Sequence, residues 1–131
     1  MRAYVAITPS ELQSFLEIGS FPASQAFVVG LESPDDAALT SDDQEELEFE
    51  LSWQAAAESR ARQGKPMALG MALAVDLEQD QLGEVVGEHV GLLSNILWPQ
   101  VQSLLLSESE EPELSWFAAQ EIPTYLPQWL A

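Results

Sequence analysis

One apolar run of nine residues, MALGMALAV at positions 67–75, decides the fold. The run is too short to cross a bilayer as a helix, which takes about 20 residues. It lies between Gly64-Lys65-Pro66 and a polar segment that begins at Asp76, so it is also too short and too bounded for a helix of its own. A continuous apolar run of this length is typical of a strand buried on both faces. We therefore predict a sheet that contains this strand.

Shorter apolar stretches bounded by turn residues lie on both sides of this run, and they are typical of further strands. We predict a single layer of mostly antiparallel sheet, with strands near 3–7, 25–29, 67–75, 89–94, 101–106 and 113–119. Residues 76–88 are predicted to form a loop and residues 97–100 a turn. The stretch 82–97 is open to a second interpretation, because its apolar residues follow helical spacing while three glycines weaken a helix.

Two helices are predicted from their end signals. Thr8-Pro9-Ser10-Glu11 combines an N-cap, a first-turn proline and a capping-box glutamate, and Gly19 is a natural stop, so one helix is expected near 9–18. The second is expected near 42–63, although residues 46–53 alternate between polar and apolar as a strand does. We assign them to a helix because glutamate is poor in strands and the stretch continues into an alanine-rich one.

The second helix is apolar on two sides. The spacing predicts one face of Leu47, Leu51, Ala55, Ala57 and Ala61, and another of Phe49, Trp53 and Ala56. A helix of this kind either lies deep in the fold or offers one side to a partner.

The sum is an α+β fold in a single domain over 1–131, with a proline-containing C-terminal tail at 122–131. Pro123 and Pro127 predict that this tail is not a continuous helix. We expect it to fold back on the domain, with a dimer or partner interface as the alternative. Trp98 and Trp116 are expected in the core, because both lie beside strand signals.

The charge excludes several partners. The chain has 22 acidic and 4 basic residues, a formal charge of −18, and too few cations to bind a nucleic acid backbone or an anionic membrane. The acids are concentrated in two segments, which hold Asp35, Asp36, Asp42, Asp43, Glu45, Glu46, Glu48 and Glu50, then Glu108, Glu110, Glu111 and Glu113. Three of the cations, Arg60, Arg62 and Lys65, are predicted to close a helix C-terminus, with a small anion site as the alternative.

No motif predicts an enzyme, a metal site or a cofactor. The absence of cysteine excludes disulfides and thiolate chemistry. His89 is the single histidine and has no nucleophile motif beside it, so we interpret it as structural. Asp76–Asp80 resembles the start of a calcium loop, but Gln81 and Gly87 stand where the loop needs glycine and glutamate.

Several segments together resemble an uncharacterised family of small bacterial proteins. The resemblance is carried by Met1-Arg2-Ala3-Tyr4, Thr8-Pro9-Ser10-Glu11-Leu12, Glu46-Leu47-Glu48-Phe49, Ala74-Val75-Asp76, Leu97-Trp98-Pro99-Gln100-Val101, and Leu114-Ser115-Trp116-Phe117 with Glu121. It implies strands, not a helix, around 90–106. The family has no known activity or site residues to transfer.

The function predicted from these observations is that of a non-enzymatic, cytoplasmic protein that docks an acidic helix face on a basic protein surface or self-associates, without metal or cofactor. The candidate contacts are Asp42, Asp43, Glu45, Glu46, Glu48, Phe49, Glu50 and Trp53. One alternative is a small enzyme that uses carboxylates with Arg60 or Arg62 on a small ligand. A further alternative is an acidic surface that serves solubility only.

Overall fold

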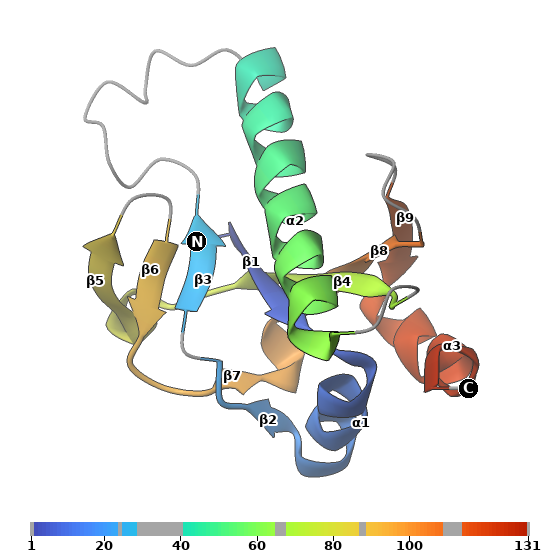
Figure 1. Cartoon of the computed structure of the whole chain (residues 1–131). Helices are drawn as coiled ribbons and strands as arrows, with labels where there is room; N and C mark the ends of the chain where they lie inside the picture. The colour runs from blue at the N-terminus through green and yellow to red at the C-terminus, as the bar shows by residue number, and fades with distance from the viewer. Residues whose placement is uncertain are drawn as a thin grey trace.

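Seven strands form one antiparallel sheet in the computed structural model of the chain (Figure 1). The structure describes residues 2–23, 25–28, 41–64, 68–86, 89–108 and 114–130, without the side chains of 41–45, 47 and 86. The strands of this sheet are β1 (Arg2–Ile7), β3 (Gln25–Val28), β4 (Gly70–Asp76), β5 (Leu82–Val86), β6 (His89–Leu92), β8 (Val101–Ser107) and β9 (Ser115–Ala118). Their order across the sheet is β5-β6-β3-β1-β4-β8-β9.

The remaining elements pack around this sheet. They are a second, two-stranded sheet of β2 (Ser20–Phe21) and β7 (Ile96–Leu97), the helices α1 (Pro9–Ile18), α2 (Ser41–Gln63) and α3 (Ile122–Leu130), and the 3₁₀ turns η2 (Gln79–Gln81), η3 (Trp98–Gln100) and η4 (Ala119–Glu121). The predicted α+β fold with a mostly antiparallel sheet is therefore confirmed.

The apolar run that predicted the sheet supplies β4, and its residues 70–75 are all buried. β4 pairs with β1 on one side, from Arg2 opposite Asp76 to Ile7 opposite Met71. It pairs with β8 on the other side. Its central place explains why the run is apolar without alternation, because both of its faces are covered.

Helices cover both faces of the sheet. Successive side chains of a strand point to opposite faces, so Ala3, Val5 and Ile7 of β1 belong to one apolar cluster, and Tyr4 and Ala6 belong to another. The first cluster includes buried residues of α1 and α3. The second includes buried residues of α2, which crosses β1 and β4 in Figure 1.

The α2 side of the sheet is lined with small residues, which lets the helix approach closely. Ala55 and Ala56 of the helix are fully buried against a cluster that includes Ala72 and Ala74 of β4. The predicted helical faces are partly wrong, because Ala57 and Ala61 are exposed while Ala56 joins the buried side.

The predicted end signals of α1 are confirmed. The Thr8 hydroxyl accepts a hydrogen bond from the Glu11 amide (3.3 Å), and the Thr8 amide donates to the Glu11 carboxylate (2.9 Å). Gly19 ends the helix in the left-handed conformation at φ 88°, and its amide donates to the Phe15 carbonyl. This end leads directly into β2.

The predicted loop at 76–88 is wrong, because this segment contains η2 and then β5. The predicted strand near 89–94 is confirmed as β6, and the helical alternative for 82–97 is wrong.

The prediction that the C-terminal tail is not a continuous helix is also wrong. The C-terminal tail forms α3 despite its prolines. Pro123 lies in the first turn, where no intrahelical donor is needed. Pro127 lies within the helix, where the burial of Ile122, Leu126 and Trp129 offsets the lost hydrogen bond.

The tail does fold back on the domain, as predicted. Trp129 is 8% exposed, and its ring meets the Phe117 ring of β9 edge to face at 5.2 Å. Trp98 is half-buried and packs edge to face on Phe15 at 5.2 Å. The prediction for Trp116 is wrong, because this side chain is exposed on an edge strand.

Candidate functional site

α2 carries the residues that the sequence predicted as partner contacts. Glu46 and Glu50 are exposed, and Phe49 between them is 46% exposed. Glu48 and Trp53 are half-buried. The side chains of Asp42, Asp43 and Glu45 lie outside the described residues. The structure thus places two carboxylates and one aromatic ring together on the surface of one helix.

The N-terminal turns of α2 extend beyond the sheet (Figure 1). A helix of 23 residues is about 35 Å long. The strand β1 beneath it has six residues and spans about 20 Å. The two lengths explain the overhang, because the C-terminal half of the helix already covers the strand.

Tyr4 of β1 is buried on the face of the sheet that α2 covers. Burial raises the pKa of the Tyr4 hydroxyl above its ordinary value, and the negative charge of Glu48 raises this pKa further. Arg2 opposes these effects. Glu48 is half-buried, while Glu46 and Glu50 are exposed.

Arg60 joins the C-terminal end of α2 to the strands. Its Nε donates to the carbonyl of Ala68 at 3.0 Å, and its Nη2 donates to the hydroxyl of Ser107 at 2.7 Å and to the Ser107 carbonyl at 3.1 Å. The guanidinium thus connects the helix to the residues just before β4 and to the end of β8.

Arg62 makes a similar connection on the other side of the helix. Its Nη2 donates to the carbonyl of Ala6 at 2.9 Å and lies 3.0 Å from the carboxylate of Glu11. The same carboxylate completes the capping box of α1. The prediction that these cations close a helix C-terminus is confirmed for Arg60 and Arg62, since both lie in the last turn of α2, while Lys65 lies outside the described residues.

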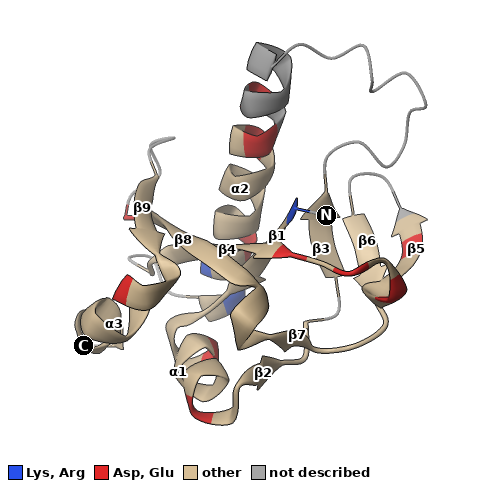
Figure 2. Cartoon of the chain, turned by 180° about the vertical axis from the view of Figure 1, so that it is seen from behind, with Lys and Arg blue, Asp and Glu red and all other residues tan. Residues whose placement is uncertain are grey.

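The described arginines are all bonded within the chain, because Arg2 also pairs with Asp76 at 3.0 Å. Figure 2 shows red acidic segments on several elements and few blue ones. The exposed acids among the described residues are Glu17, Glu46, Glu50, Glu78, Asp80, Glu84 and Glu108. The described surface therefore carries a strong negative field, which attracts cations and repels anions.

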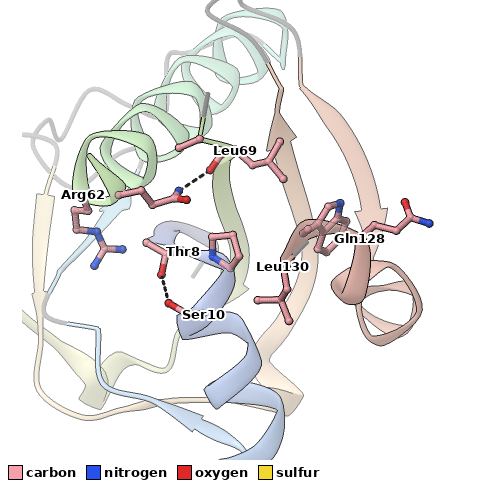
Figure 3. A pocket seen from close by; sticks show the side chains of 10 residues that line it. Thr8, Ser10, Arg62, Leu69, Gln128 and Leu130 are labelled. Atoms are coloured by element: carbon pink, nitrogen blue, oxygen red, sulfur yellow. Dashed lines mark hydrogen bonds between the residues drawn. The ribbon is translucent and has the colours of Figure 1, made fainter. Parts of the chain in front are cut away.

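A pocket with a volume of about 630 Å³ lies between the start of α1 and the C-terminal ends of α2 and α3 (Figure 3). Thr8 and Ser10 line it from the start of α1, Arg62 from the end of α2, and Gln128 and Leu130 from α3. A volume in this range is typical of a small-molecule site.

The chemistry of this pocket differs from the predicted enzyme site. Among the described residues that line it, Arg62 is the one charged side chain, and there is no Asp, Glu or His. The carboxylate nearest in sequence, Glu11, is paired with Arg62. The lining therefore offers no carboxylate for general acid–base chemistry.

His89 and the calcium-like segment, the other candidates for chemistry, are both held by contacts within the fold. His89 is half-buried in β6, where its ring packs on its cross-strand partner Phe27 at 4.3 Å. Asp76 of the calcium-like segment pairs with Arg2, and Gln81 is buried. Within the part of the chain that the structure describes, no three His, Cys, Asp or Glu side chains are placed to share a metal ion.

Trp116 is an exposed aromatic residue that the sequence pattern predicted in the core. It is 62% exposed on β9, which ends the sheet. A signal was present, because the strand is short and follows the acidic segment 108–113, and charged flanks are typical of edge strands.

A comparison with protein-family models, curated proteins and solved structures finds no match to this chain. Among the described helices, none has the length and apolar content needed to span a bilayer.

Proposed function

We propose that this protein acts without catalysis of its own, as an acidic module that binds a basic surface of another protein through the outer side of α2. One observation carries the proposal. Glu46 and Glu50 are exposed beside the half-exposed ring of Phe49, and the described arginines are bonded within the chain. The negative field is therefore not neutralised locally, and it lies next to apolar surface.

Such a surface suits a partner rich in lysine and arginine. Complementary charge speeds the encounter of two proteins, and the effect weakens as salt screens it beyond about 10 Å. Self-association is the alternative within this proposal, but it must overcome the repulsion between two chains of charge −18 each.

The proposal is tested by affinity capture from the native lysate at low and high salt, followed by direct binding of each captured protein. One variant neutralises Asp42, Asp43, Glu46 and Glu50 as Asn or Gln. A matched control neutralises four acids elsewhere, which are Glu17, Glu78, Asp80 and Glu84.

We expect a basic partner that is lost at high salt and is lost in the α2 variant but kept by the control. If both variants weaken binding equally, the charge acts without a defined face. If no partner is captured at either salt, the acidic surface serves solubility only, and the proposal is wrong.

A second candidate function, a small enzyme acting on a small ligand, is favoured by a second, smaller pocket of about 90 Å³ that Arg62 lines together with Glu11 and Glu58. The reaction requires a carboxylate, and Glu11 is the one paired with that arginine. Screening small anions by the shift they cause in melting temperature, with Arg62→Ala as the control, tests this candidate directly.

A further inference from the structure

Trp116 extends the apolar layer beneath α2 to the outer edge of the sheet. The pairings place Ala6 opposite Ala72, Ala72 opposite Leu105, and Leu105 opposite Trp116. Directly opposed side chains of an antiparallel pair share a face. Since Ala6, Ala72 and Leu105 pack in the cluster that contains α2, Trp116 lies on the same side of the sheet as this helix.

One side of α2 carries aromatic residues and lies toward β8. Phe49, Trp53, Ala56 and Arg60 follow one another at spacings of four, three and four residues, so they form one stripe along the helix. Arg60 at the end of the stripe donates to Ser107 of β8. The stripe therefore faces β8. Its aromatic residues, Phe49 and Trp53, lie N-terminal to the Arg60–Ser107 hydrogen bond.

The levels of the helix and the sheet can be matched from two contacts. The carbonyl of Ala56 lies against Gly70, at one end of β4. Farther along the helix, Arg60 donates to the carbonyl of Ala68, so α2 runs opposite to β4. Trp53 precedes Ala56 by about one turn and therefore lies toward the level of Ala72, whose row continues through Leu105 to Trp116.

We infer that Phe49, Trp53, Leu105 and Trp116 form one apolar surface, and that it receives a large apolar side chain carried by a lysine- or arginine-rich segment of another protein. This inference rests on the proposed function and adds the apolar half of the contact. Trp116 and Phe49 are 62% and 46% exposed, whereas Leu105 is half-buried between the sheet edge and the helix. Partly exposed aromatic residues are the side chains that most often anchor protein interfaces.

The surrounding charge decides the occupant. Glu46 and Glu50 are exposed on the helix, and Glu108 is exposed directly after β8. A second copy of the chain would bring the same charge of −18 to the contact. Nucleic acids and anionic membranes are repelled in the same way. A basic protein segment is the occupant that gains from both the charge and the rings.

The experiment uses three designed peptides of equal length and measures their affinity for the full chain by calorimetry at low salt. The first is an amphipathic helix of lysine and leucine. The second replaces every leucine with serine and keeps the charge. The third replaces every lysine with glutamate. The protein variants are Trp116→Ala and the control Ile18→Ala, which removes a side chain that is 72% exposed on α1.

We expect the lysine–leucine peptide to bind more tightly than the lysine–serine peptide and the glutamate peptide not to bind. Trp116→Ala should weaken the lysine–leucine peptide about tenfold, the loss typical of an anchoring residue, and Ile18→Ala should leave it unchanged. Because Trp116 is exposed, the variant should stay folded, and its thermal unfolding checks this.

Other results overturn the inference and separate it from the proposed function. If both basic peptides bind equally and Trp116→Ala changes nothing, the acidic contact stands but the aromatic anchor is wrong. If neither basic peptide binds, both proposals fail. If Trp116→Ala and Ile18→Ala weaken binding equally, the apolar contact has no defined place. A dimer in sedimentation that Trp116→Ala abolishes would make the occupant a second copy.

Discussion

A Cβ atom added to Gly70 would lie 2.5 Å from the carbonyl oxygen of Ala56, a distance that real side chains do not reach. The helix α2 therefore rests on the backbone of β4 at this point, and the glycine is required by close approach. The same contact sets the height of the whole helix above the sheet.

Gly70→Ala should lower the free energy of unfolding by about 2–3 kcal/mol, because the helix must move away from the sheet. Gly91→Ala is the control, since its Cβ would meet its nearest neighbour, the carbonyl of Glu84, at an ordinary 3.6 Å. Urea unfolding of both variants measures the difference. Equal free energies of unfolding for the two variants would show that the helix can move away from β4 without loss of stability.

Gln81→Glu should destabilise the protein at neutral pH. The Gln81 amide is buried and donates to the carbonyl of Asn95 at 3.1 Å, while its oxygen accepts from Gln100 at 2.6 Å. A carboxylate there cannot donate, and its charge would be buried against a carbonyl oxygen, at a cost of about 2–4 kcal/mol.

The loss at Gln81→Glu should shrink as the pH falls, because the protonated side chain regains a donor. Burial raises the pKa of this carboxyl in the folded state above its unfolded value of about 4.3, so the charge penalty is complete above the folded pKa and vanishes only below the unfolded pKa. Gln102→Glu is the control, since Gln102 is exposed on β8. If the loss of stability in Gln81→Glu did not depend on pH, the shape of the side chain, and not its charge, would be responsible.

Tyr4 should make stability fall at alkaline pH. Burial and Glu48 raise its pKa in the folded protein. Below the unfolded pKa of about 10, Tyr4 is neutral in both states and its stabilising effect is complete. As pH rises through the folded pKa, this effect is lost, because the unfolded chain ionises more readily.

The Tyr4 prediction can be measured with a single-tyrosine protein. The chain has two tyrosines, so Tyr125→Phe leaves Tyr4 as the only source of phenolate absorbance. We expect its titration to lie above that of the same protein in urea. Coincident titrations of the folded and unfolded protein would contradict the raised pKa.

Trp129→Ala should lower the free energy of unfolding by about 3–4 kcal/mol, as expected when a buried aromatic side chain is removed. The ring packs between α3 and β9 through Phe117 and Tyr125. Deleting residues 127–131 should cost at least as much. Leu130→Ala is the milder control, since Leu130 is 39% exposed. A deletion that leaves thermal unfolding unchanged would show that the tail does not stabilise the domain.

The sequence predicted the elements whose signals are local. Both ends of α1 are indicated within a dozen residues, by Thr8 and Glu11 at the start and by Gly19 at the end, and each of these residues makes the expected hydrogen bond. The apolar run at 67–75 predicted a buried strand because burial on both faces removes the alternation.

The failures occurred where distant contacts override local preference. Proline disfavours a helix at 122–130 by about 3 kcal/mol per interior residue, but burial of Ile122, Leu126 and Trp129 against the sheet outweighs it. β5 has a glycine and a polar residue in its sequence, and pairing with β6 makes it a strand.

The candidate site was predicted only in part, for a related reason. Charge and periodicity identified the outer side of α2, but they could not show that Trp116, far along the chain, lies on the same side of the sheet. Its exposure depends on strand order, because β9 ends the sheet. Strand order arises from pairing, which no local signal records.

The position of β1 has a consequence for how the chain folds. The first strand of the chain is the central one, and its partner residues on β4 are as far as 74 positions away, from Arg2 to Asp76. One edge of β1 pairs with the nearby β3, but its other edge must wait, during synthesis, for β4. Chains dominated by such distant pairings fold slowly, over milliseconds to seconds. In this interval the β4 edge of the apolar β1 has no partner strand, and the high negative charge opposes aggregation with other copies through this edge.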